Sequence, residues 1–426
     1  MHKIVKLLSA HVLLYCILTL VFTASIIGVH LIPHEAVTDN IRSSVQYLCE
    51  KGIYYQVGPS GYYRIDTYTD AIALNEAFVM DEHKPIESSM LNYVKRDSLN
   101  NDEIENLRLV LENGNPNAYY YSYSRNWNGY QIFLRPLLVL TDLQGIIIIN
   151  FIFVLGLALL TFYSLWKKGL RDYAICFCIS WTVLNFFIMP LCTQYVTCIS
   201  IAMLGILAIL YMPALTENNL NTSLTFFTIG AVCNFFDWLT IPQLTYGLPF
   251  IAYYLLNKRI NIIKALLITG TPWVVAYALT LISKWTLGTL LTDYNCFELA
   301  LDAVKTRTST TSVGLGVDYN LFYCAKTLLG FFWGHGIVLC FIGLYIYMYI
   351  KNKRAVVNSI QENYWLLVVA LLVPLWFFAM RNHSFLHFSL FAWRALFLTV
   401  VSIMMFTLLT YKKVTHRDKK CECLLD

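Results

Sequence analysis

Residues 144–171 read QGIIIINFIFVLGLALLTFYSLWKKGLR, and this stretch sets the fold class. Residues 144–166 hold no charged side chain, and about 20 apolar residues in a helix cross the roughly 30 Å hydrocarbon core of a bilayer. Lys167, Lys168 and Arg171 follow at once. Basic residues beside a span favour the cytoplasmic side. The stretch therefore predicts a transmembrane helix that ends in the cytoplasm.

The composition of the whole chain agrees with a membrane location. Of 426 residues, 58% are hydrophobic and 13% are charged, whereas soluble domains hold about 25% charged residues. A soluble fold of this length could not bury so much apolar surface, but a bilayer does not require it to. The net charge of +5 is concentrated between apolar runs. This pattern indicates membrane orientation and argues against a nucleic-acid partner.

The same length criterion finds ten candidate spans, so we expect an all-α transmembrane bundle. The first apolar run is too long for a signal peptide and no small-residue cleavage site follows it, so we read it as a retained span. The spans cover approximately residues 8–32, 144–166, 173–191, 196–213, 223–238, 241–257, 264–285, 328–350, 364–380 and 388–411.

Five basic clusters orient these spans. They are Lys3 with Lys6, Lys167–Arg171, Lys258–Lys264, Lys351–Arg354 and Lys412–Lys420. With ten spans every cluster falls on the cytoplasmic side, which predicts a multi-pass plasma (inner) membrane protein with both termini in the cytoplasm. The loop at residues 216–221 has no Lys or Arg, so the count of spans stays open by two there.

The orientation divides the chain into six parts. Residues 1–32 hold the first span, 33–137 an extracytoplasmic subdomain, 138–285 spans two to seven, 286–327 an external loop, 328–411 the last three spans and 412–426 a basic cytoplasmic tail. Ile104–Leu111 has the apolar spacing of a helix, and Asn113–Pro116 has the composition of a turn. The Ser-, Thr- and Gly-rich run Thr306–Gly316 is typical of a mobile loop.

The chain has twelve cysteines, and most of them lie in apolar runs, where cysteine acts as a small hydrophobic residue. No CxxC pair and no Cys/His cluster has the spacing of a zinc site. We therefore expect neither a disulfide framework nor metal-ligating residues.

A pair of acidic residues follows the first span. Asp66 and Asp70 are four residues apart, so a helix would present both carboxylates on one face. Neighbouring carboxylates suit a general base, a divalent metal site or one raised pKa. A solvated helix face would show the same spacing, so both interpretations remain open.

An aromatic segment runs from Tyr119 to Tyr130 and continues to Arg135. Its Arg125, Trp127 and Arg135 are candidates for stacking on sugar rings and holding phosphate. An aromatic belt at the membrane interface is the equal alternative.

Two further groups lie near predicted span ends. Asp237 lies in a tight hairpin between spans, and an ionisable residue near hydrocarbon is a functional candidate. Arg381, His383 and His387 join the last two spans, with Arg394 inside the last one. These cations and histidines suit a lipid phosphate or diphosphate. Polar caps on helix ends are the competing interpretation. All four groups fall at the predicted outer boundary.

Several motifs carry a resemblance. Asp66-Thr-Tyr-Thr-Asp70, Tyr123-Ser-Arg-Asn-Trp-Asn-Gly-Tyr130, Phe236-Asp-Trp-Leu-Thr-Ile-Pro242 and Asn382-His-Ser-Phe-Leu-His387 resemble those of a family of uncharacterised bacterial polytopic membrane proteins. More distantly, the plan is similar to the GT-C superfamily of glycosyltransferases, which use polyprenyl-phosphate sugars and carry an acidic catalytic motif in the first external loop. The adjacent Asp-Asp or Asp-Glu form of that motif is absent here.

This resemblance implies a transferase that moves a sugar from a polyprenyl-phosphate donor to a glycan, lipid or protein acceptor at the outer membrane face. Asp66 or Asp70 would be the general base, and Arg381, His383 and His387, with Arg125, would neutralise the leaving phosphate. No cofactor is required by the sequence, although Mg²⁺ or Mn²⁺ is compatible with it. The alternatives are a transporter or flippase of lipid-linked glycans and a glycan polymerase or ligase.

Overall fold

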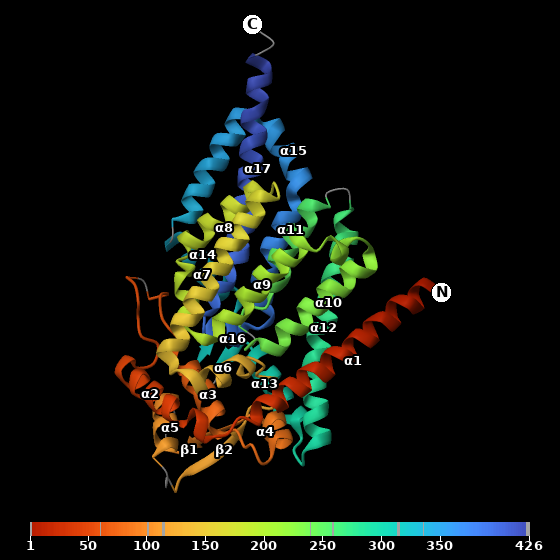
Figure 1. The fold of residues 1–426 in the computed structure, drawn as a ribbon. Coiled ribbons are helices and arrows are strands. Elements are labelled where there is room, and N and C mark those ends of the chain that lie inside the picture. Colours follow the sequence, from red (N-terminus) through yellow and green to blue (C-terminus); the bar gives the residue numbers. More distant parts are fainter. Residues whose placement is uncertain are drawn as a thin grey trace. The chain divides into compact units, whose positions relative to one another are not determined.

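The structure is a computed structural model. It describes residues 2–59, 61–99, 102–112, 116–238, 240–257, 260–312, 316–334 and 336–422. Helices make up nearly all regular structure in these ranges, with two short antiparallel strand pairs (Figure 1). The all-α prediction is confirmed. Asn113 to Asn115 of the predicted turn, and Lys258 and Arg259 of one basic cluster, lie outside the described residues.

The chain forms two compact units, and each combines two segments that are separated in the sequence. The first unit contains Met1–Leu160 and Phe187–Val304, and the second contains Thr161–Phe186 and Lys305–Asp426. Each unit is described below by itself.

The first unit combines the residues up to Leu160 with the helices between Phe187 and Val304. Its elements are α1 (His2–His30), α2 (Glu35–Lys51), α3 (Thr67–Val79), α4 (Pro85–Leu91), β1 (Tyr93–Asp97), α5 (Glu103–Leu111), β2 (Ala118–Ser122), α6 (Gln131–Leu140), most of α7 (Leu143–Lys167), η1 (Phe186–Leu191), α9 (Thr193–Tyr211), η2 (Pro213–Thr216), α10 (Asn219–Phe236), α11 (Gln243–Leu256), α12 (Ile262–Leu291) and most of α13 (Cys296–Thr308). Helix α5 confirms the periodicity at residues 104–111.

Residues 33–137 do not form a separate helical body. Helices α2, α3, α5 and α6 share one apolar core with strand β1, and Leu143, Ile146 and Trp238 from elsewhere in the unit complete that core. Strands β1 and β2 pair antiparallel, with Tyr93 opposite Ser122. The segment therefore includes a strand pair that a purely helical subdomain would lack, and its burial depends on the helices that follow it.

Small residues let the long helices of this unit approach one another. A Cβ atom at Gly230 of α10 would lie 2.3 Å from the carbonyl oxygen of Trp273 on α12. A Cβ atom at Gly205 of α9 would lie 2.9 Å from the Pro249 side chain on α11. Close helix packing through glycine is a common device in membrane bundles, where burial of apolar surface drives association only weakly.

The second unit is built around a pair of long helices. Its elements are α8 (Arg171–Val183), β3 (Thr311–Ser312), β4 (Val317–Asp318), α14 (Leu321–Gly334), α15 (Ile337–Ala379), α16 (Arg381–Leu386), η3 (Ala392–Ala395) and α17 (Leu396–Glu422). Helices α15 and α17 pack together, and a hydrogen bond of 2.8 Å joins the hydroxyls of Ser359 and Thr410. The backbone of α15 breaks at Asn352, where φ is −156° and ψ is 80°. The break falls inside the basic cluster Lys351–Arg354.

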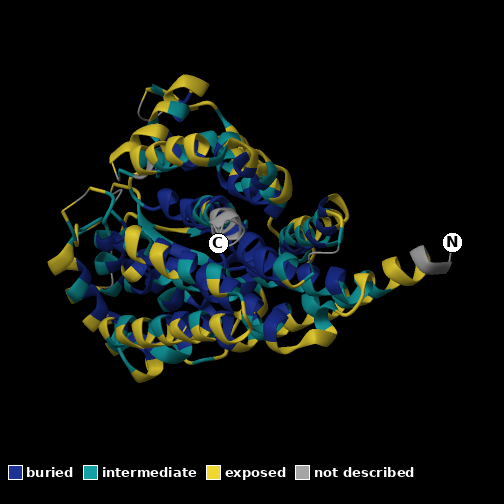
Figure 2. Cartoon of the chain, turned by 90° about the horizontal axis from the view of Figure 1, so that it is seen from above, coloured by how far each residue is buried: buried dark blue, intermediate teal, exposed yellow. Residues whose placement is uncertain are grey.

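Six helices of the described residues are long and apolar enough to cross a membrane. They are Val5–His30, Leu143–Lys167, Thr193–Tyr211, Ile262–Leu291, Leu339–Ala379 and Ala392–Thr415. Many apolar side chains on their outward faces are exposed (Figure 2). Leu20, for example, is 70% exposed. Such faces suit contact with lipid, since water would make them costly. The chain is thus a multi-pass membrane protein by its helices.

The six helices are fewer than the ten predicted spans, for identifiable reasons. Helices α8 and α11 coincide with predicted spans but have only 13 and 14 residues, which is short of the roughly 20 that a span needs. Predicted span 364–380 and the later part of predicted span 328–350 fall in the single broken helix α15. Helix α10 coincides with predicted span 223–238 but is not among the six. The expected loop at residues 286–327 also differs, because α12 continues to Leu291 and α13 covers the first part of the run Thr306–Gly316.

Candidate functional site

The acidic pair stands at the start of α3, as helical spacing predicted. Asp66 is the N-cap of the helix: its carboxylate accepts hydrogen bonds from the Thr69 backbone N–H at 3.0 Å and the Thr69 hydroxyl at 2.8 Å. Such a cap satisfies a backbone donor that the helix cannot. Asp70 follows one turn later, and both side chains are buried. The solvated-face interpretation is wrong for this pair.

Helix α9 supplies the partners of both carboxylates. Thr193 begins α9, and its backbone N–H and hydroxyl donate to Asp70 Oδ1 at 3.0 and 2.5 Å. The next residue, Gln194, donates from Nε2 to Asp66 Oδ2. The Cys192 thiol also lies 3.8 Å from Asp70 Oδ1. Two helices distant in sequence therefore meet through these two aspartates.

The second carboxylate oxygen of Asp70, Oδ2, differs from Oδ1 in its hydrogen bonding. Asp70 Oδ2 is buried and makes no hydrogen bond with any residue in the described part of the chain. Burial raises the pKa of Asp70 to about 7, against the hydrogen bonds from Thr193, which favour the charged form. A carboxyl with a pKa near neutrality can accept and release a proton at physiological pH. Asp66 differs from Asp70, since both Asp66 oxygens accept hydrogen bonds, from Thr69 and Gln194.

An apolar groove adjoins this pair. It has a volume of about 390 Å³ and includes Thr193, so it reaches the residue that bonds Asp70. Most of its other lining residues are apolar, apart from Asn150, Thr197 and Ser200, and all but Tyr130 come from α6, α7, α9 and α10. They include Leu134, Leu137, Ile146, Ile149, Phe153, Val196, Leu204 and Phe236. Such a lining excludes ions and favours a hydrocarbon ligand.

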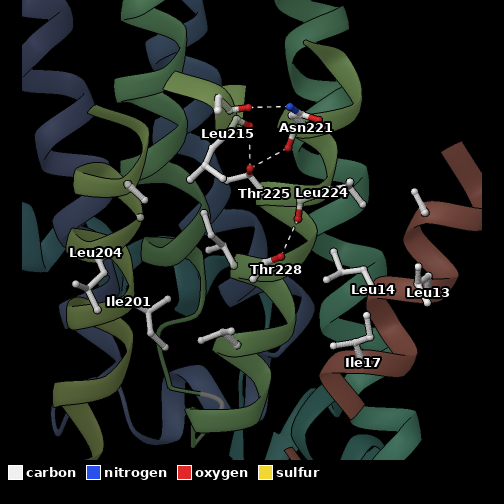
Figure 3. A pocket seen from close by; sticks show the side chains of 16 residues that line it. Leu13, Leu14, Ile17, Ile201, Leu204, Leu215, Asn221, Leu224, Thr225 and Thr228 are labelled. Atoms are coloured by element: carbon white, nitrogen blue, oxygen red, sulfur yellow. Dashed lines mark hydrogen bonds between the residues drawn. The ribbon is translucent and has the colours of Figure 1, made fainter. Parts of the chain in front are cut away.

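A larger apolar groove continues from the first. Its volume is about 790 Å³, and it shares Ile201, Leu204 and Val232 with the smaller groove. Figure 3 shows Leu13, Leu14 and Ile17 of α1 on one side and residues of α9 and α10 opposite them. Together the two grooves follow α9 and α10 from Thr193 to Asn221, at the first turn of α10.

A second buried carboxylate lies on α3. Glu76 accepts hydrogen bonds from the Asn128 amide at 3.0 Å and the Tyr130 hydroxyl at 2.5 Å. Burial raises the pKa of Glu76 to about 7. Asn128 has a φ of 54°, a left-handed conformation that Asn tolerates. Its neighbour Gly129 donates its N–H to the Phe235 carbonyl at 2.9 Å, where a side chain would clash. The segment from Asn128 to Tyr130 thus connects Glu76 of α3 to Phe235 near the end of α10.

The aromatic segment contributes mainly buried packing. Trp127 is fully buried, and its indole N–H donates to the Thr280 carbonyl at 2.6 Å. Arg135 of α6 is also fully buried and donates to the Ile32 carbonyl at 2.6 Å. Arg125 lies with its guanidinium 4.4 Å from the centre of the Tyr123 ring. The burial of Trp127 favours a core role over sugar stacking.

Lys284 is a buried cation that the sequence interpretation did not single out. It lies in α12, is fully buried and donates from Nζ to the Ser89 carbonyl at 2.6 Å. Its ammonium also lies 5.3 Å from the centre of the Trp127 ring. A lysine within a long apolar helix is a signal in the sequence that could have identified it.

Asp237 ends α10 and belongs to a cluster with two cysteines. The ligand atoms of Cys198, Cys233 and Asp237 lie within 4.8 Å of one another, and all three residues are buried. The Thr240 N–H and hydroxyl hold the carboxylate at 3.1 and 3.0 Å. Sequence spacing could not reveal this cluster, because Cys198 lies on a different helix from Cys233.

The remaining predicted residues belong to the second unit. Arg381 begins α16 and donates from Nε to the Phe378 carbonyl at 3.0 Å. The His383 and His387 rings lie 5.1 Å apart. Burial, with the nearby charge of Arg307, lowers the pKa of His387 to about 4. His387 is therefore neutral at pH 7 and contributes no positive charge. Arg394 is fully buried in η3.

No protein-family model matches the chain, and no curated protein or solved structure is significantly similar to it.

Proposed function

We propose that the protein is a GT-C-type glycosyltransferase that moves a sugar from a polyprenyl-phosphate donor to an acceptor at the extracytoplasmic membrane face. One observation carries the proposal: a buried oxygen of Asp70 makes no hydrogen bond with the described residues, the other oxygen of this carboxyl is held by Thr193, and Thr193 lines an apolar groove. A base beside a hydrocarbon-binding surface is what a lipid-linked donor requires.

We assign Asp70 the role of general base toward the acceptor hydroxyl. Asp70 Oδ2 takes the proton from an acceptor hydroxyl as the hydroxyl oxygen bonds to the anomeric carbon of the sugar. The bond from that carbon to the phosphate oxygen breaks, and the lipid phosphate leaves with the electron pair. Asp66 then has a positioning role, since it caps α3 and bonds Gln194.

The two connected grooves are assigned to the polyprenyl chain of the donor. Their linings are mainly apolar, and they share Ile201, Leu204 and Val232. Within a bilayer such a chain exchanges contacts with lipid for contacts with the groove, so close packing against the lining, and not removal from water, would favour its binding. The Thr193 end is assigned to the phosphate and sugar, because Thr193 bonds the Asp70 carboxyl there.

The leaving phosphate needs positive charge. Arg125 of the first unit is proposed to supply this charge. The phosphate-binding roles of Arg381, His383, His387 and Arg394, which belong to the second unit, stay predictions from the sequence. We also propose the ten-span topology that the sequence predicts. Both termini then lie in the cytoplasm, residues 33–137 lie outside, and the protein lies in the plasma membrane. A divalent ion such as Mg²⁺ or Mn²⁺ could add charge at the phosphate.

The test is sugar transfer in proteoliposomes that contain purified protein. Radiolabelled polyprenyl-phosphate hexoses and pentoses serve as donors, and an extract of envelope glycans and lipids serves as acceptor. Asp70→Asn should lower transfer by roughly 100-fold or more, as loss of a general base does. Asp39→Asn is the matched control, because Asp39 is an aspartate of α2 whose side chain is 96% exposed. Equal transfer by the Asp70→Asn and control proteins would refute the proposal.

A transporter of lipid-linked glycans is the second candidate, and Lys284 is the observation that favours it. Fully buried ionisable groups in membrane helices often mark substrate or proton pathways, and the charges of Lys284 and Glu76 interact. Movement of lipid-linked glycan across the vesicle bilayer, lost in Lys284→Met and retained in Asp70→Asn, would support transport over transfer.

A further inference from the structure

The cluster at the end of α10 has the composition of a metal site. Cys198, Cys233 and Asp237 offer two sulfur atoms and one carboxylate oxygen, all within 4.8 Å of one another. Cys198 also lies within hydrogen-bonding reach of both Cys233 and Asp237. Ligand atoms of one tetrahedral ion stand roughly 3.3–3.8 Å apart, because each lies about 2.0–2.3 Å from the metal, so small rotations of these side chains would bring the three atoms to ligand positions. No chemistry assigned above uses the two thiols.

Local structure explains why these groups converge. Asp237 donates its backbone N–H to the Cys233 carbonyl at 2.8 Å, so the two residues are one helical turn apart. Residues at this spacing present their side chains on the same face of a helix. Cys198 comes from α9, which packs against α10. Two helices therefore supply the three groups without any change in backbone.

The carboxylate is already oriented by other groups. The Thr240 N–H lies within hydrogen-bonding distance of both Asp237 oxygens, and the Thr240 hydroxyl donates to Oδ1 at 3.0 Å. Ligands of protein metal sites are commonly held by such outer partners. All three candidate ligands are buried, so a bound ion would be shielded from exchange with solvent.

We propose that Cys198, Cys233 and Asp237 bind one Zn²⁺ ion. Thiolate ligands select zinc, copper(I) or iron–sulfur clusters, and a carboxylate is a good ligand for zinc but a poor one for copper(I). Binding displaces the two thiol protons and leaves one position of a tetrahedral ion for water or a fourth ligand.

The position of the ion indicates its role. Cys198 is four residues after Gln194 on α9, so the two side chains share a face of that helix. Gln194 bonds Asp66, and the preceding Thr193 bonds Asp70. An ion that joins α9 to the end of α10 would thus hold the first turns of α9 in place. These turns carry Thr193 and Gln194, the hydrogen-bond partners of Asp70 and Asp66. The zinc proposal itself does not rest on the proposed transferase activity.

The experiment measures metal binding by the full-length protein purified in detergent under reducing conditions. Elemental analysis should give about one zinc per chain after dialysis against limiting Zn²⁺. Co²⁺ in place of Zn²⁺ should produce the near-ultraviolet absorption band of thiolate-to-cobalt charge transfer. Cys198→Ser, Cys233→Ser and Asp237→Asn should each weaken binding at least tenfold, and each serine variant should reduce the band.

Cys176→Ser is the matched control, because Cys176 is also buried but lies outside the cluster. Protection of the wild-type thiols from alkylation by Zn²⁺ gives a measurement that does not depend on the folding of any variant. Three results would overturn the proposal: zinc no more abundant than in the cluster variants, no thiolate band with Co²⁺, or a Cys198–Cys233 disulfide in protein purified without oxidant.

Discussion

The buried carboxyl of Asp70 should make the stability of the protein depend on pH in a way that one substitution removes. The ordinary pKa of this side chain is 3.8, and burial raises it to about 7 in the folded protein. The folded state therefore binds the Asp70 proton more tightly than the unfolded state does. Stability from this group is fully present below pH 3.8 and is lost as the pH rises through 7.

The magnitude follows from the pKa change. Each pKa unit corresponds to about 1.4 kcal/mol, so ionising Asp70 costs the folded protein about 4 kcal/mol in total. Between pH 5 and pH 8 the loss is about 2–3 kcal/mol, because the unfolded carboxyl is already ionised at pH 5. In the Asp70→Asn protein the side chain at this position has no proton to release between pH 5 and pH 8. Its buried amide N–H donors cost roughly 1–3 kcal/mol at every pH, which shifts the curve without tilting it.

The assay is thermal unfolding in detergent from pH 5 to pH 8, for the wild-type and Asp70→Asn proteins. The wild-type Tm should fall with rising pH more steeply than that of the variant, so the two curves converge or cross at high pH. Glu76 also has a raised pKa, but it is present in both proteins and cancels in the difference. Parallel curves would refute the assignment of a raised pKa to Asp70.

Three further substitutions test the packing around the site. Thr193→Val removes a 2.5 Å hydrogen bond that favours the charged carboxyl, so the pKa of Asp70 should rise further and the steep part of the Tm curve should move to higher pH; an unmoved curve would contradict this. Gly230→Ala puts a Cβ atom 2.3 Å from the Trp273 carbonyl and should destabilise the protein by about 1–3 kcal/mol, seen as a lower Tm. Trp127→Phe loses the hydrogen bond to the Thr280 carbonyl and should lower Tm. Sugar transfer at saturating donor should change less than about twofold. A large loss of transfer at unchanged Tm would instead assign Trp127 to substrate binding.

Local properties of the chain allowed several features to be predicted. Apolar runs predicted the helices, since a run such as 144–166 has too few polar groups to be stable in water. Helical periodicity placed Asp66 and Asp70 one turn apart. The number of spans was not settled by these runs, because hydropathy does not report where a helix such as α8 ends.

Other features depend on contacts between distant parts of the chain. Thr193 and Gln194 lie more than 120 residues from the aspartates that they bond, and nothing in the sequence around them indicates those partners. Trp127 has the composition of an interfacial residue, yet packing places it in the core.

The sequence by itself determined that this is an all-α membrane protein, because hydrophobicity and helical spacing act over a few turns. Only the tertiary structure decided which carboxyl oxygen lacks a partner, which grooves adjoin it and which cysteines meet Asp237. Those properties arise from close packing between helices, where a pKa or a ligand set depends on atoms that only the fold brings together.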